Sequence, residues 1–357
     1  MSQSPCGQSS QARAVRTLKD GYWDITEVIA LADGSLRVRK RNKGSTAPGP
    51  WGIESLRREI NYLQGLSGRA RSIFPTVLAT WDSTLAATPA IGYEMPFYER
   101  HMDAGELARR GTLSQADIDV FQDHLADAVV DRLHETMTTE HPLSQHMATA
   151  MRHALDELSS SSTFAPLLDS AAIELNGQHA LGPRAALDRI VSHSDAFAAL
   201  DATPTVRLHG DFFLENILWS PLPKGRDEPR LILVDPVSVA GISCGPALFD
   251  LVKYESYATG ELLALRTERV EVDGFAGNQR RYRWRIRSED PSILPFSARD
   301  WHGRFRTAFE ARHGPADPRL RHLIDGYFSL AMALNTTGLQ QQARLLKATT
   351  ELNAVLT

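Results

Sequence analysis

Residues 208–236 read LHGDFFLENILWSPLPKGRDEPRLILVDP, and this stretch decides how the rest of the chain is interpreted. Asp211 and Asn216 lie five residues apart in one short loop that follows a β-prone lead. Asp235 comes at the end of an apolar run. We expect a turn after Asp211 to bring Asn216 back beside it. We also expect the hairpin between Trp219 and Leu231 to return the chain, so that Asp235 approaches from the neighbouring strand.

These three side chains are the groups that phosphoryl transfer requires. One carboxylate orients an acceptor hydroxyl, and a carboxylate–amide pair suits magnesium. An isolated His-Gly-Asp occurs by chance. The pattern His209–Gly210–Asp211 with Asn216, followed by Val234–Asp235–Pro236, is far more specific. It indicates a phosphotransferase.

Composition excludes several classes of protein. The 357 residues carry a net charge of −4 with 42% hydrophobic and 23% charged residues, as in an ordinary globular protein large enough for two lobes. No basic field indicates nucleic acid or an anionic membrane. The two cysteines, Cys6 and Cys244, fit a reducing cytoplasm rather than a disulfide framework. No apolar run reaches the roughly 20 residues that span a bilayer.

A lysine and a glutamate in the first hundred residues are candidates for nucleotide binding. Two β-prone runs flank Asp33–Gly34, which is a strong hairpin signal, and Lys40 lies on the second run. A helix then follows with Glu59 beside its apolar stripe. We favour a Lys40–Glu59 ion pair that positions the lysine on phosphates. Glu54 competes with Glu59 for this role, and Arg39 or Lys43 competes with Lys40.

The next apolar segment, residues 90–97, is expected to be a strand that runs into an extended segment at Pro96. We interpret Glu94 and Met95 as hinge residues whose backbone pairs with a purine, although a plain strand and loop fits equally well. No glycine-rich dinucleotide or Walker-type loop occurs. If phosphates are bound, the turn at residues 32–35 is expected to cover them.

The remaining segments are interpreted mainly as structure. Ser114 and Asp117 form a capping box that opens a core helix. The histidines of the middle region are treated as ordinary polar positions: His134, His141 and His146. Residues 268–287 predict an arginine-rich hairpin, and residues 320–356 predict two helices. From residue 261 onward, 15 Lys and Arg stand against 11 Asp and Glu, which favours a neutral or acidic acceptor.

On these motifs, about residues 20–350 resemble the aminoglycoside phosphotransferase and choline-kinase-like family. The resemblance implies an α+β, protein-kinase-like two-lobed fold: a small β-rich N-terminal lobe with one key helix, and a larger, mainly helical C-terminal lobe. It also implies roles for the motif residues. Asp211 would be the catalytic base, Asn216 and Asp235 the magnesium ligands, and His209 and Asp250 structural supports of the catalytic loop. Pro236 after Asp235 argues against an activation-loop protein kinase.

The expected organisation is a disordered tail at residues 1–15, a nucleotide-binding lobe at 16–96 and a C-terminal lobe at 97–357. The expected activity is Mg²⁺-dependent transfer of the γ-phosphate of ATP or GTP to a hydroxyl of a small molecule. We favour a sugar- or nucleoside-containing antibiotic as acceptor, with resistance or self-protection as the outcome, in a cytoplasmic monomer or homodimer. The alternatives are a metabolic kinase for choline, a ketosamine or a sugar, an inactive kinase-fold binding protein, and a two-metal hydrolase.

Overall fold

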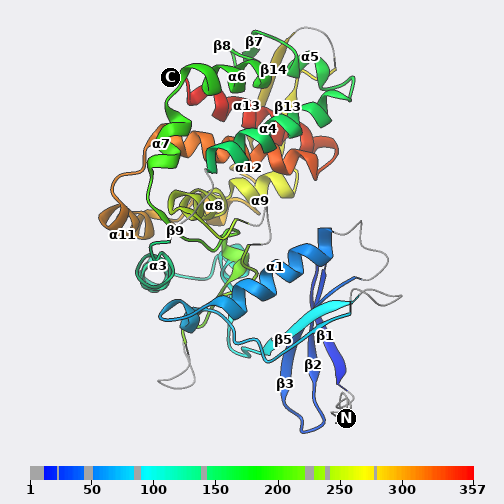
Figure 1. Ribbon diagram of the computed structural model, residues 1–357, viewed down its shortest axis with the longest axis vertical. Helices are drawn as coiled ribbons and strands as arrows, with labels where there is room; N and C mark the ends of the chain where they lie inside the picture. The colour runs from blue at the N-terminus through cyan, green and yellow to red at the C-terminus, as the bar shows by residue number, and fades with distance from the viewer. Residues whose placement is uncertain are drawn as a thin grey trace, which may run out of the picture. The chain divides into compact units, whose positions relative to one another are not determined.

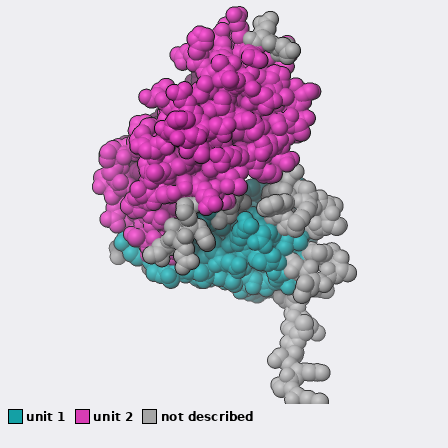
Figure 2. Space-filling model, turned by 45° about the horizontal axis from the view of Figure 1, so that its top comes forward, with its two compact units in different colours: residues 1–102, 209–211, 216–243 teal, residues 103–208, 212–215, 244–357 magenta. Residues whose placement is uncertain are grey.

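The computed structural model describes residues 12–21, 24–43, 51–83, 90–137, 143–221, 229–237, 242–276 and 280–357. The chain divides into two compact units, coloured separately in Figure 2. Unit 1 comprises residues 1–102, 209–211 and 216–243, and unit 2 comprises residues 103–208, 212–215 and 244–357. Unit 1 therefore takes in residues 209–211 and 216–243, which the sequence assigned to a continuous C-terminal lobe.

Unit 1 is built on a five-stranded antiparallel sheet with strand order β1-β2-β3-β5-β4 (Figure 1). Its strands are β1 (Arg13–Asp20), β2 (Asp24–Ala30), β3 (Leu36–Asn42), β4 (Ala79–Asp82) and β5 (Ile91–Pro96). The hairpin predicted at Asp33–Gly34 joins β2 and β3, and Gly34 takes the left-handed conformation (φ 81°) that such a turn requires. Strand β1 begins at Arg13, inside the tail that we expected to be disordered, while residues 1–11 lie outside the described residues.

The predicted helix is α1 (Trp51–Gly65), which packs against β3 and β5 (Figure 1). Its apolar stripe is buried, since Leu56 and Leu63 are at most 2% exposed. A 3-10 turn, η2 (Ala70–Ile73), follows it. Residues on the inner face of α1 are thereby held against the strand that carries Lys40.

The sheet register corrects one expectation about phosphates. The turn at residues 31–35 closes the end of the β2–β3 hairpin where Ala30 pairs with Leu36. Lys40 pairs with Thr26, four residues further along, which is about 13 Å away at strand spacing. The end of β2 nearer to Lys40 is the one that begins at Asp24, because Asp24 pairs with Asn42. The turn at 32–35 is therefore too distant to cover phosphates held by Lys40.

The motif segment folds as predicted into two short paired strands. Strand β10 (Ile217–Trp219) pairs antiparallel with β11 (Leu231–Leu233), and the 3-10 turn η4 (Leu214–Asn216) precedes β10. On either side of this segment, β9 (Thr205–Arg207) pairs with β12 (Cys244–Pro246) within unit 2. The two-residue strand β6 (Met102–Asp103) lies at the boundary in sequence between the units.

Unit 2 is mainly helical. Its α-helices are α2 (Ala104–Arg110), α3 (Gln115–Ala126), α4 (Leu143–Ser159), α5 (Ala165–Leu168), α6 (Pro183–His193), α7 (Ala196–Ala202), α8 (Leu248–Ala258), α9 (Glu261–Arg266), α10 (Leu294–Ser297), α11 (Gly303–His313), α12 (Pro318–Leu334) and α13 (Gly338–Ala354). The capping box of Ser114 and Asp117 opens α3 as predicted, and a π-helical segment, Asp127–Leu133, continues it. Helices α12 and α13 confirm the predicted C-terminal pair, and they pack on each other (Figure 1).

Unit 2 also contains a four-stranded sheet, of order β13-β14-β7-β8. Strands β13 (Val270–Asp273) and β14 (Arg281–Ile286) form the predicted hairpin, in which Arg285 pairs with Glu271 across the two strands. The sequence interpretation missed β7 (Ile173–Leu175) and β8 (Gln178–Ala180). Asn176–Gly177 joins them with both residues at positive φ, and this dipeptide is itself a strong hairpin signal.

Candidate active site

Lys40 and Glu59 form a buried ion pair in unit 1. Alternation along β3 points Lys40 to the α1 side of the sheet, where Lys40 Nζ lies 3.0 and 2.8 Å from the two oxygens of Glu59. Tyr93 of β5 donates its hydroxyl proton to Glu59 Oε1 at 2.7 Å. Lys40 and Glu59 are each only 2% exposed. Both of the favoured residues are therefore brought together.

The competing residues pair elsewhere. Glu54 lies about one turn before Glu59 on α1. It accepts hydrogen bonds from Arg57 and Arg58 of the same helix. Arg39 points to the opposite face of the sheet from Lys40 and pairs with Glu94 at 2.8 Å. Lys43 pairs with Asp20.

Asp235 joins the Lys40–Glu59 pair and brings in a lysine that sequence reasoning missed. Lys40 Nζ lies 2.9 Å from Asp235 Oδ1, and Lys19 Nζ of β1 lies 2.9 Å from Asp235 Oδ2. Lys19 and Lys40 both lie opposite Thr26 of β2, so their side chains leave the same face of the sheet. Finding Lys19 required the β1 strand and its register, for which the sequence interpretation had no signal.

Charge and burial act against each other in this cluster. Burial opposes the charged form of Lys40, but the carboxylates of Asp235 and Glu59 outweigh it and raise the lysine's pKa. Burial also opposes ionisation of Asp235, yet Lys40 and Lys19 hold its pKa well below the ordinary range. Burial raises the pKa of Glu59 to about 7; the Lys40 ammonium opposes this rise, and the negative charge of Asp235 adds to it. Asp235 is thus a fixed anion between two ammonium groups.

The loop that carries Asp211 and Asn216 is a tightly connected structure. Asn216 donates from Nδ2 to the Asp211 carbonyl oxygen at 2.9 Å, with Asp211 Oδ2 at 3.4 Å. Gly210 has φ 79°, and a Cβ there would collide with the carbonyl oxygen of Ile242, so only glycine fits. The expected return of Asn216 beside Asp211 is what the structure shows.

His209 links this loop to the segment that carries Asp235. The Asp211 N–H donates to His209 Nδ1 at 3.3 Å, which leaves Nε2–H to donate to the Val234 carbonyl at 3.0 Å. The His209 ring is fully buried and stacks on Phe74 with centroids 5.9 Å apart. The Val237 N–H donates back to the His209 carbonyl at 2.8 Å. The backbone around Asp235 is therefore fixed to the backbone around Asp211.

Asn216 offers a ligand position for a cation. Its Oδ1 atom is buried and has no hydrogen-bond partner among the described residues. An amide oxygen left open in this way, near carboxylates, is chemically suited to magnesium, which prefers hard oxygen ligands. Asp235 supplies carboxylate oxygens in the same unit, although Lys40 and Lys19 hold them here. The donor set fits a magnesium ion that competes with an ammonium group for Asp235.

Glu94 and Met95, which we predicted to form a hinge, have no side-chain contact with Lys40, Glu59 or Asp235 among the interactions of the described residues. The Glu94 side chain lies on the face of β5 opposite to Tyr93 and pairs with Arg37 and Arg39. Its carbonyl oxygen already accepts the Leu78 N–H at 2.7 Å. Met95 is buried at 6% exposure.

Asp250 has a buried partner that the sequence interpretation overlooked. Asp250 is fully buried on α8, and its Oδ2 lies 3.2 Å from His134 Nε2 within unit 2. His134 Nδ1 lies 3.2 Å from His313 Nε2. Treating His134 as an ordinary polar position was wrong, because it is only 4% exposed. Its spacing of four from buried Val130 continues the helix stripe and was the available signal.

Glu215, the residue before Asn216, is a second overlooked anchor. In unit 2 its carboxylate accepts hydrogen bonds from three side chains at 2.7–3.0 Å, namely Arg109, Tyr257 and Arg266. The pKa of Glu215 is lowered, because these partners, Arg266 foremost, outweigh the effect of its burial. Two arginines and a tyrosine of unit 2 therefore hold the Glu215 carboxylate in place.

The sheet with its lysine, the helix glutamate and the Asp–Asn loop define a protein-kinase-like fold, with an N-terminal antiparallel sheet and a larger helical region. A sequence model described as the phosphotransferase enzyme family matches residues 27–285, so the chain belongs to that family. The predicted fold class is confirmed, and so is the predicted enzyme class, a phosphotransferase that acts on a hydroxyl group.

The chain is similar to several solved structures at low sequence identity. A protein assigned as a fructosamine-3-kinase from Thermobifida fusca is 15% identical, with a TM-score of 0.52, over 97% of this chain and 94% of its own. A glucosamine kinase in complex with glucosamine, ADP and inorganic phosphate is 15% identical over 97% and 94%, with a TM-score of 0.41. A choline kinase from Cryptosporidium parvum is 10% identical over 98% and 89%, with a TM-score of 0.44. No curated protein matches the chain.

Within the ranges that the structure describes, no helix is both long and apolar enough to cross a membrane.

Proposed function

We propose that the enzyme transfers the γ-phosphate of ATP or GTP to a hydroxyl of a small molecule, with Asp211 as the catalytic base. The observation that carries this proposal is the connected set Glu59–Lys40–Asp235 in unit 1, which His209 and Val234 link to the Asp211 loop. Lys40 holds phosphate oxygens of the nucleotide, and Glu59 fixes the position of Lys40. His209 and Asp250 support the loop.

In the proposed reaction the acceptor hydroxyl passes its proton to the Asp211 carboxylate as its oxygen bonds to the γ-phosphorus. The bond between that phosphorus and the β–γ bridging oxygen breaks, and the nucleoside diphosphate leaves. Magnesium, when bound, would be held by Asn216 and Asp235 and would neutralise charge on the phosphate oxygens. Positioning and charge neutralisation supply most of the rate.

We assign Lys19 the role of pairing with Asp235 and neutralising part of its charge. Its ammonium group lies on the second Asp235 oxygen, so it contributes positive charge beside the expected phosphates. Asp211 and Asp235 both attract it and raise its pKa, Asp235 more strongly, so Lys19 is charged at neutral pH. Glu94 and Met95 keep the proposed hinge role because of their position on β5.

We propose a sugar- or nucleoside-containing antibiotic as the acceptor, with modification in the cytoplasm giving resistance or self-protection. The support is a region beyond residue 261 with 15 basic against 11 acidic residues, which disfavours a polycationic acceptor. The other acceptors to be compared are choline, ketosamines and simple sugars.

The test is incubation with ATP or GTP, magnesium and a panel of antibiotics, nucleosides, sugars and choline, with mass spectrometry for the gain of one phosphoryl group. Asp211→Asn should lower kcat by about 10²–10⁴, because it removes the base. Asp188→Asn makes the same chemical change at an exposed position of α6 and should leave kcat unchanged. Undiminished turnover in Asp211→Asn would refute the assigned mechanism, and product only with a metabolite would replace the antibiotic.

A further inference from the structure

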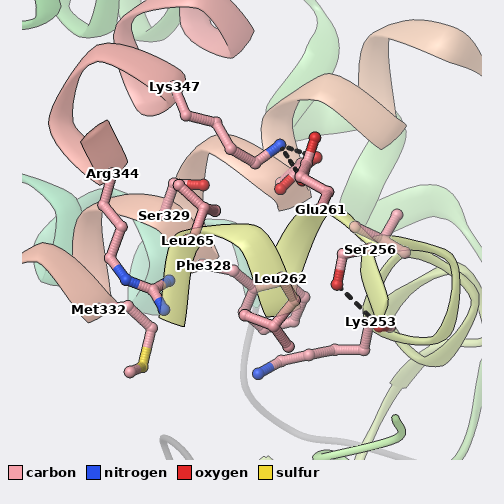
Figure 3. Close-up of a pocket in the computed structure, with 12 residues that line it drawn as sticks. Lys253, Ser256, Glu261, Leu262, Leu265, Phe328, Ser329, Met332, Arg344 and Lys347 are labelled. Carbon is pink, nitrogen blue, oxygen red and sulfur yellow. Dashed lines mark hydrogen bonds and ion pairs between the residues drawn. The ribbon is translucent and has the colours of Figure 1, made fainter. Parts of the chain in front are cut away.

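A small pocket in unit 2 is lined by a buried arginine that has no hydrogen-bond or ion-pair partner among the described residues. The pocket lies among α8, α9, α12 and α13, and Arg344 of α13 lines it (Figure 3). Arg344 is 3% exposed, its Nε atom is buried, and its guanidinium makes no hydrogen bond or ion pair within the described residues. Guanidinium groups in protein interiors are normally paired, because an unpaired buried charge is strongly unfavourable.

The carboxylates that line the pocket form their ion pairs with Lys347 and not with Arg344. Lys347, which lies on the same helix, instead pairs with Glu261 at 2.7 Å and Asp325 at 2.6 Å (Figure 3). The Lys253 ammonium lies 4.5 Å from the centre of the Phe328 ring. Burial and the nearby charge of Arg266 lower the pKa of Arg344 to about 10, and Glu261 opposes this shift. The guanidinium group is therefore still charged at neutral pH. The pocket therefore has a positive charge at Arg344 that forms no ion pair among the described residues, because Glu261 and Asp325 pair with Lys347.

We propose that this pocket binds the carboxylate of a small molecule, with Arg344 as the principal contact. The planar guanidinium fork matches a carboxylate in two parallel hydrogen bonds. The hydroxyl of Ser329, which also lines the pocket and has no hydrogen bond within the described residues, is available as a further donor. The proposal goes beyond phosphoryl transfer, since it concerns unit 2 alone.

The size and charge of the pocket select the ligand. Its volume is about 30 Å³, roughly twice what one water molecule needs, so it admits a carboxylate head group but not a ring. Glu261 and Asp325 also line the pocket and would repel a second negative charge. A monoanion is therefore preferred over a phosphate dianion. The rest of the molecule remains outside the pocket.

The first experiment measures acetate binding to the nucleotide-free protein, by calorimetry and by the shift in Tm, with acetamide as the uncharged counterpart. Acetate should raise Tm and acetamide should not. Arg344→Lys should weaken acetate binding about tenfold or more, since it loses hydrogen bonds to a charged partner. Arg344→Met should abolish the acetate effect and raise Tm in acetate-free buffer, because it removes an unpaired buried charge.

Arg283→Met is the matched control, because Arg283 is an exposed residue of β14 in the same unit. This variant should bind acetate as the wild type does. The inference is overturned if acetate does not bind the wild type, or if it binds Arg344→Lys and Arg344→Met as tightly as the wild type. Arg344→Lys keeps the charge and the helix-forming length, so it tests the site even if Arg344→Met does not fold.

A second experiment identifies the source of the carboxylate. Once an acceptor is found, acetate is tested as an inhibitor in the kinase assay. Competition with the acceptor means that the acceptor's own carboxylate fills the pocket. Binding without competition assigns the pocket to a separate small anion. Both results support the site, and both are distinct from failure of the proposed function, because acetate binding is measured without nucleotide or turnover.

Discussion

Lys19 on β1 and Lys40 on β3 leave the sheet from the same position, because both lie opposite Thr26 of the strand between them. Each ammonium group lies 2.9 Å from a different oxygen of Asp235. The expected metal ligand is thus held by two monovalent cations from the protein. A divalent cation that binds Asp235 must displace at least one of them, and Lys19 is the more exposed, at 48% against 2%.

Replacing Lys19 should therefore strengthen metal binding. In Lys19→Met, one oxygen of Asp235 is released and a repelling charge is removed. We expect the affinity of the nucleotide-free protein for Mn²⁺ to rise by up to about fivefold, the upper end of the range for an exposed ion pair. Electron paramagnetic resonance of free Mn²⁺ measures this directly. The control Arg13→Met, on the same strand, should leave the affinity for Mn²⁺ unchanged. Weaker Mn²⁺ binding in Lys19→Met would contradict the prediction.

The Glu59 carboxylate should matter for both folding and nucleotide binding. Glu59→Gln leaves Lys40 with Asp235 but removes a buried charged hydrogen-bond partner, so the free energy of unfolding should fall by about 1–3 kcal/mol. The KM for nucleotide should rise as Lys40 loses its fixed position. Urea unfolding and nucleotide titration measure these effects. The control is Glu54→Gln on the exposed face of the same helix, with an expected loss below about 1 kcal/mol; equal losses in both variants would contradict the pairing.

Asn216 should be required for metal binding through its unpartnered oxygen. Asn216→Ala removes Oδ1 together with the bond to the Asp211 carbonyl. We expect Mn²⁺ affinity to fall at least about tenfold, which is what loss of an outer-shell partner already causes. Calorimetry with Mn²⁺ and circular dichroism separate lost binding from lost structure. Asn335→Ala at the end of α12 should behave as the wild type, and unchanged Mn²⁺ affinity in Asn216→Ala would remove the residue from the proposed ligand set.

The pH dependence of stability should carry a contribution from His313. Burial, with His134 nearby, lowers the pKa of His313 to about 4 from its ordinary value near 6.5. Between these values the unfolded chain binds a proton that the folded protein does not, so folding stability should decline as the pH falls from about 6.5 to about 4. Tm measured from pH 7 to pH 4.5 should fall more steeply for the wild type than for His313→Gln. Exposed His153→Gln should follow the wild type, and parallel curves for all three proteins would contradict the shift.

The sequence predicted those parts of the structure that depend on residues close together along the chain. The dipeptide Asp33–Gly34 is enough to predict a turn. Asp211 and Asn216 are only five residues apart, so they could be assigned to one loop. His134 and His313 are 179 residues apart, so their contact depends on how α11 packs and has no local signature. The turn at residues 32–35 was assigned to phosphates because β1 was not recognised. Once β1 is placed, pairing registers decide which turn lies near Lys40.

Unit 1 combines segments that are far apart in the sequence, and this has a consequence for synthesis of the chain. Its sheet is complete in sequence at Pro96, but Asp235 follows Lys40 by 195 residues. At about 5–20 residues per second, translation takes roughly 10–40 s to cover that distance. During this interval the nascent sheet has Lys19 and Lys40 without the carboxylate that they share. The cluster can therefore be completed only late in translation, and a fragment ending at residue 102 would retain the lysines without their common partner.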